Sequence, residues 1–188
     1  MSEEHLDDEI EINIENVVAS ADINQNVDIT SVNKVFKTSE YNPKKFPGLV
    51  FRLKRPKTST LIFESGKMVC TGAKSSKEAK AAVRKVVREL KKKDIVILNK
   101  PIIEIQNMVA SANLKQQVDL ELAADLLENV MYEPEQFPGL IYRMQDPKTV
   151  MLVFSTGKIV CTGGKSENMV NEAVHNLFRV LDDYALFF

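Results

Sequence analysis

The chain has 188 residues, 44% of them apolar, with a formal net charge of −1. A chain of this length can bury a hydrophobic core, and no apolar run approaches the ~20 residues that a membrane span needs. The neutral total argues only weakly against nucleic-acid binding because the charge is uneven: residues 10–98 hold 18 basic and 9 acidic side chains, whereas residues 99–188 hold 7 and 12.

Residues 1–9 contain five acids and no lysine or arginine, so we expect a frayed acidic lead. Residues 10–98 then predict a long β-branched strand (IEINIENVVASADI), a short helix (DITSVNKVF) and a proline-rich loop (YNPKKFPG). Three short strands (LVFRLK, STLIFES, KMVCTG) and a long amphipathic helix (SSKEAKAAVRKVVRELKKK) follow.

The same series returns in residues 99–188 without a gap. The segment FPGLVFRLKRPKTSTLIFESGKMVCTGAKS begins at Phe46, and FPGLIYRMQDPKTVMLVFSTGKIVCTGGKS begins at Phe137, an offset of 137 − 46 = 91. Between Ile12 and Leu90, 34 of 79 positions are identical to their counterparts. The chain is therefore a tandem duplication, which we divide into an acidic lead (1–9), a first repeat (10–98) and a second repeat (99–188).

The short strands are apolar on both faces. In the first repeat Val69 and Thr71 point one way while Met68 and Cys70 point the other, and the second repeat has the same alternation. One long helix can cover only one face of such a sheet, so something must cover the other. A sandwich or a homodimer that buries the open faces is one alternative.

No catalytic or metal-binding motif is repeated. Cys70 and Cys161 occupy equivalent positions, and we interpret them as buried strand residues rather than as a redox or metal pair. TGGKS lacks the upstream glycine of a phosphate-binding loop, because Ile159 stands there. Basic residues are repeated near the strand ends, which is typical either of solvated strand ends or of phosphate contacts.

The motifs QNMVASA, YEPEQFPGLIYRM, PKT and FSTGKIVCTGGKS, in this order and within a 91-residue repeat, resemble the TATA-box-binding proteins. These are general transcription factors of archaea and eukaryotes, and the short lead favours an archaeal member. The resemblance covers roughly residues 10–181. It implies an α+β fold: a pseudo-twofold saddle, with one continuous curved antiparallel sheet of about ten strands and helices on the convex side.

The resemblance also implies DNA-binding residues in both repeats. Intercalating rings match Phe46, Phe63, Phe137 and Phe154. Polar contacts to base edges match Asn16, Thr71, Asn107 and Thr162. The apolar floor matches Val18, Leu61, Val69, Val109, Leu152 and Val160. Phosphate contacts match Lys45, Arg52, Ser65, Lys67, Lys74, Arg143, Lys158 and Lys165.

The expected function follows from the resemblance: the protein binds the TATA box in the minor groove, bends the DNA and nucleates the preinitiation complex. It implies transcription factor B as a partner, bound through Glu133, Glu135 and Gln136, and RNA polymerase indirectly. We expect no enzyme activity, cofactor or membrane, and a monomer on DNA, with a dimer left open for the free protein. The location would be the nucleoid in the cytoplasm of an archaeon, or the nucleus of a eukaryote.

Two other functions are weighed against this one. A sheet that stacks single-stranded bases on its phenylalanines would prefer single strands and would not bend a duplex. A protein adaptor would bind no DNA, and an enzyme such as a glycosylase would need a catalytic group that the sequence does not show. The closing YALFF differs from the polar tail that the resemblance suggests, and we expect it to pack against the helices.

Overall fold

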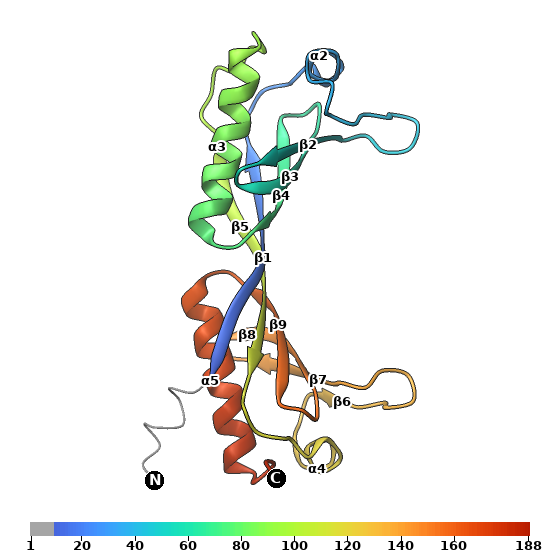
Figure 1. Cartoon of the computed structure of the whole chain (residues 1–188), viewed down its shortest axis with the longest axis vertical. Coiled ribbons are helices and arrows are strands. Elements are labelled where there is room, and N and C mark those ends of the chain that lie inside the picture. Colours follow the sequence, from blue (N-terminus) through green and yellow to red (C-terminus); the bar gives the residue numbers. More distant parts are fainter. Residues whose placement is uncertain (1–9) are drawn as a thin grey trace. The chain divides into compact units, whose positions relative to one another are not determined.

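The computed structural model describes residues 10–188 and divides them into two compact units (Figure 1). One unit is Asn16–Gln106, and the other joins the chain up to Glu15 with Asn107–Phe188. The predicted acidic lead lies outside the described residues. The division that we predicted at residue 98 stays a prediction, as do the curvature and twofold symmetry of a saddle.

The elements of the first repeat follow the predicted order. They are β1 (Glu11–Asp22), α2 (Ile29–Val35), β2 (Leu49–Lys54), β3 (Lys57–Ile62), β4 (Lys67–Ala73) and α3 (Ser76–Lys92). The side chain of Asp28 caps α2 by accepting from the Ser31 amide, and Ser75 caps α3 by accepting from the Glu78 amide. Short acceptors of this kind stabilise a helix start because they satisfy free amides of the first turn.

The second repeat has the same order with one addition. Its elements are β5 (Ile102–Asn113), α4 (Leu120–Leu126), β6 (Val130–Met131), β7 (Leu140–Gln145), β8 (Lys148–Val153), β9 (Lys158–Gly164) and α5 (Glu167–Asp183). By hydrogen-bonded neighbours the sheet reads β2-β3-β4-β1-β5-β9-β8-β7-β6, with antiparallel pairings.

The described chain thus has nine strands where we expected about ten. In the second repeat β6 pairs with β7 through Val130–Tyr142 and Met131–Ile141. Its counterpart in the first repeat is only an isolated bridge between Glu40 and Val50. The first repeat therefore lacks a counterpart of β6, because it keeps the pairing that matches Met131–Ile141 and lacks the one that matches Val130–Tyr142.

In each unit the long helix covers one face of the short strands (Figure 1). In α3 the buried side chains include Val83, Val86 and Leu90, and they pack on strand residues such as Ile62 and Met68. Burying each aliphatic side chain of this size contributes roughly 1.5–3 kcal/mol, and the helix gains its stability from this face. Within residues 10–188, no helix of the same unit covers the opposite face of these strands.

The two cysteines are free and buried, as predicted. Burial raises the pKa of the Cys161 thiol to about 11, and it also raises the pKa of Cys70. Both are core residues of their strands. No helix in the described part of the chain is long and apolar enough to span a membrane.

The closing residues continue the repeat instead of forming a separate tail. Ala185 (φ 54°) matches Asp94 (φ 62°) as the left-handed residue that ends the long helix. Leu186 is fully buried, and its carbonyl accepts from the Asp119 amide, which connects the start of α4 to the end of α5. The ring of Phe187 lies 5.1 Å from that of Phe178 in α5, which confirms the expected packing on a helix.

We therefore expect Leu186→Ala to lower the free energy of unfolding by about 2–3 kcal/mol, because it leaves a cavity between α4 and α5. Phe188→Ala is the matched control, since that ring is 81% exposed and should change stability by less than about 0.5 kcal/mol. Urea denaturation followed by circular dichroism measures both. Equal stability of the two variants would show that the tail is not part of the core.

Candidate nucleic-acid interface

The strand face that no helix of its own unit covers carries half-exposed apolar side chains. In one unit Leu61 of β3 pairs with Val69 of β4, which in turn pairs with Ser20 of β1. The other unit repeats this row as Leu152, Val160 and Ser111. Val18 and Val109 are half-buried in the same way. Of the six residues predicted as an apolar floor, Leu61 and Val69 are cross-strand neighbours in one unit, as are Leu152 and Val160 in the other, while Val18 and Val109 lie two residues before the paired serines in β1 and β5.

A pair of phenylalanines lies beside each row, since Phe63 lines the same hollow as Val69, and Phe154 the same hollow as Val160. Phe46 and Phe63 lie with ring centroids 5.9 Å apart and planes at 68°, and Phe137 and Phe154 have the same distance and angle. Phe46 is 44% exposed and Phe137 is 37% exposed, so these rings are not core residues. An edge-to-face pair of this kind is itself favourable, which holds two large apolar groups at the surface.

Glycine makes room for each pair. A Cβ at Gly48 would lie 2.8 Å from Phe46 Cε1 and 3.0 Å from Phe63 Cε1. Gly139 has the equivalent contacts with Phe137 and Phe154. The glycine of each FPG motif is therefore needed for the rings to rest in this position.

The rings border a hollow on the open face of each unit. One hollow is lined by Phe63, Ser65, Lys67 and Val69 together with residues of β1 and β5. The other is lined by the matching Phe154, Thr156, Lys158 and Val160. Each hollow combines an apolar base with one lysine, and its lining also contains acids, Asp22 and Glu104 in one unit and Glu11 in the other.

Each unit also holds an oriented asparagine. The Oδ1 of Asn16 accepts from the amide of Gly72 at 2.7 Å, and its Nδ2 donates to Thr71 Oγ1 at 3.0 Å. Asn107 makes the matching bonds with Gly163 (2.7 Å) and Thr162 (3.2 Å). Because the backbone amide fixes which end is oxygen, the Nδ2 group is the end that is presented as a donor.

The two glycines are site residues that sequence reasoning missed. Gly72 has φ 102° and Gly163 has φ 96°, in the region where side chains are strained. This conformation lets each amide point at the asparagine oxygen. The repeated TG dipeptide was the available signal.

The predicted phosphate contacts lie at strand ends and in loops, except for Arg52 and Arg143, which lie within β2 and β7. Lys67 and Lys158 begin β4 and β9, and Lys74 and Lys165 follow those strands. Lys45 precedes Phe46 in an exposed loop, and the Ser65 hydroxyl accepts weakly from the Lys67 amide at 3.4 Å. Arg52 differs from its counterpart Arg143 because its guanidinium forms an ion pair with Glu40.

The loops that carry the first ring of each pair have the same backbone but opposite charge. The amide of Phe46 bonds the Asn42 carbonyl at 3.0 Å, and that of Phe137 bonds the Glu133 carbonyl at 2.9 Å. Lys44 and Lys45 stand in the first loop where Glu135 and Gln136 stand in the second. All four side chains are exposed, so this charge difference is presented to a partner.

Comparison with known proteins assigns the family. The model of the family "Transcription factor TFIID (or TATA-binding protein, TBP)" matches twice, over residues 11–93 and 102–184. The chain belongs to the TATA-binding protein family. The two matches coincide with the two repeats, and the family's members are transcription factors rather than enzymes.

Archaeal relatives of the TATA-binding protein family are similar over most of the chain. The TATA-box-binding protein of Pyrodictium occultum is 56% identical over 169 residues, which are 90% of this chain and 85% of that protein. The one from Sulfurisphaera tokodaii is 54% identical over 170 residues, 90% of this chain and 86% of that protein. The solved structure of Methanococcus jannaschii TBP matches with a TM-score of 0.82 and 48% identity, covering 93% of this chain and 98% of that one.

Proposed function

We propose that this chain binds the TATA box of duplex DNA in the minor groove. The observation that carries this is the repeated set of exposed phenylalanine pair, apolar row and oriented asparagine. An A·T minor groove offers only acceptors, adenine N3 and thymine O2, which the Nδ2 groups of Asn16 and Asn107 suit. The guanine amino group would project into the apolar row and would be left without a partner there.

The phenylalanine pairs would act as wedges. A ring inserted at a base step replaces part of the lost stacking and kinks the duplex, a mode of binding for which TATA-binding proteins are themselves a reference case. The basic residues at the strand ends would hold the backbone on either side of the groove. Because the apolar row provides much of the contact, a chain with a net charge of −1 can still bind DNA.

The acidic loop of the second repeat would bind a protein partner. Glu133, Glu135 and Gln136 gain nothing from a phosphate backbone, whereas a basic surface complements them. Transcription factor B is the partner that the resemblance implies, and RNA polymerase would join through it. On this proposal the protein acts at promoters in the nucleoid of an archaeon.

A gel shift tests the proposal directly. We expect a labelled duplex with a TATA-like box to bind at least about 30-fold more tightly than the same duplex with two A·T pairs replaced by G·C, since each mismatched pair costs about 1–3 kcal/mol. A single strand of the same sequence is the third probe. Preference for the single strand would favour a base-stacking module instead, and binding of none of the three would favour a protein adaptor.

A further inference from the structure

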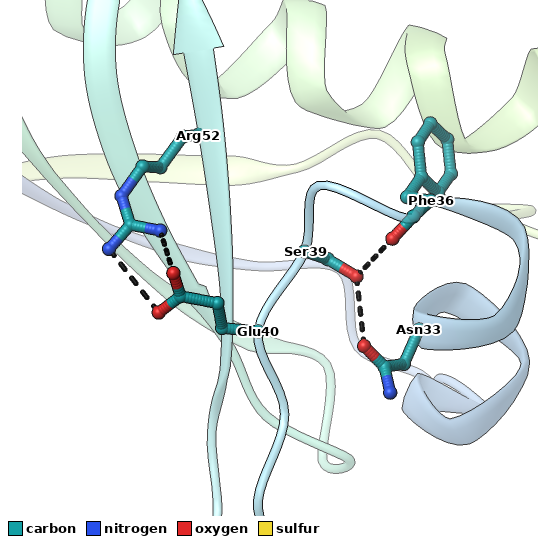
Figure 2. Close-up of polar contacts among 5 residues, drawn as sticks. All are labelled: Asn33, Phe36, Ser39, Glu40 and Arg52. Atoms are coloured by element: carbon teal, nitrogen blue, oxygen red, sulfur yellow. Dashed lines mark hydrogen bonds and ion pairs between the residues drawn. The ribbon is translucent and has the colours of Figure 1, made fainter.

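The ion pair between Arg52 and Glu40 distinguishes Arg52 from Arg143, its counterpart in the second repeat. Arg52 Nη1 lies 2.8 Å from Glu40 Oε1, and Nη2 lies 3.4 Å from Oε2, so the two planar groups face each other (Figure 2). Both side chains are at the surface, with 51% of Arg52 and 66% of Glu40 exposed. A ligand can therefore reach the guanidinium, but it meets the carboxylate as well.

The second repeat has the same register without the carboxylate. Glu40 bridges to Val50, and Met131, 91 residues later, pairs with Ile141, which is the counterpart of Val50. Met131 thus stands where a glutamate would face Arg143, and it is 54% exposed. Within residues 10–188 no ion pair involves Arg143.

The segment that carries Glu40 is held in place by its own bonds. The Ser39 hydroxyl donates to the Phe36 carbonyl at 2.6 Å and lies 3.1 Å from Asn33 Oδ1 (Figure 2). The backbone of Glu40 exchanges two hydrogen bonds with Val50, at 2.8 and 3.1 Å. In the second repeat Val130 and Ala124 replace Ser39 and Asn33, so this side-chain bond belongs to the first repeat.

We propose that Glu40 competes with a DNA phosphate for Arg52, so that this guanidinium holds the DNA backbone less strongly than Arg143 does in the second repeat. This inference rests on the proposed function. A phosphate that approaches Arg52 must displace the carboxylate or share the guanidinium with it, whereas Arg143 has no such competitor to lose. The pair therefore weakens one of two equivalent arginine contacts and leaves the other unchanged.

The salt dependence of binding measures how many phosphates the basic groups of the protein neutralise. Each phosphate that a basic group neutralises contributes a slope of about −0.9 to log K against log [salt]. With a TATA duplex we expect Glu40→Gln to steepen the slope by up to about 0.9. We also expect it to tighten binding at low salt by about 2- to 5-fold, the range that an exposed ion pair allows. Met131→Glu should make the opposite change, with a shallower slope and weaker binding.

Two further variants separate competition from other causes. Glu89→Gln removes the carboxylate of another surface ion pair, with Lys92 at 3.1 Å on α3, and should leave the slope unchanged. In an Arg52→Gln background, Glu40→Gln should lose most of its effect, since the competition acts through the guanidinium.

The outcomes are distinct. An unchanged slope in Glu40→Gln, or weaker binding, would overturn the inference and would make Glu40 a residue that merely orders Arg52. A full effect of Glu40→Gln in the Arg52→Gln background would overturn it in favour of direct repulsion from DNA. A wild-type protein that binds TATA and G·C duplexes equally would instead refute the proposed function, whatever the variants do to the slope.

Discussion

Phe154→Ala is expected to weaken binding to a TATA duplex by about 1–3 kcal/mol, roughly 5- to 150-fold, and to reduce the bend in the DNA. The ring is half-exposed beside Phe137 and lines the same hollow as Val160. Removing it takes away one wedge while leaving the groove contacts in place. Quantitative gel shifts measure the affinity, and energy transfer between dyes on the two DNA ends measures the bend.

The fold of the variant should survive, because Phe154 is only partly buried and supports no core layer. Circular dichroism and the urea midpoint check this, and Phe188→Ala controls for the loss of an exposed ring from the same unit. Phe63→Ala should behave like Phe154→Ala, since the two pairs have the same geometry. If Phe154→Ala unfolds the protein while the remaining folded fraction bends DNA normally, the ring is a core residue and its assignment is wrong.

Glu133→Arg combined with Glu135→Arg is expected to leave binding to DNA alone intact or slightly tighter and to abolish the ternary complex with transcription factor B. Both side chains are exposed in the second loop, where an acid beside the phosphate backbone contributes mild repulsion. Reversing the charge removes that repulsion and places like charges against a basic partner, which costs several kcal/mol. Gel shifts with and without transcription factor B measure both steps.

The matched control makes the same change of charge outside the loop. Glu121→Arg with Glu128→Arg alters two exposed acids of the same unit and should preserve the ternary complex. Directional transcription in a reconstituted assay should fail only in the loop variant, because the loop charge is the strongest difference between the repeats beside the proposed DNA face. Equal ternary affinity of wild type and loop variant would leave the acidity as a feature of solubility alone.

The repeat, the elements and the composition of the open face could be read from the amino-acid sequence. Alternation of Met68 and Cys70 with Val69 and Thr71 depends only on the two-residue period of a strand, which the structure confirms. Asp28 and Ser75 cap the helices by accepting from amides three residues away, so the helix starts also depend only on neighbouring residues. The specific motifs, in their fixed order, indicated the protein family, and the match to the family model confirms it.

Three features depended on the tertiary structure, because each joins groups that the chain separates. The orientation of Asn16 comes from the amide of Gly72, 56 residues away, and needs the positive φ of that glycine. The sequence left open whether Phe46 and Phe63 are core or surface residues. They lie outside the core because α3 covers the other face of β2, β3 and β4. The pairing of Glu40 with Arg52 follows from a single bridge to Val50, a register that no local pattern specifies, since register is decided by which strands meet.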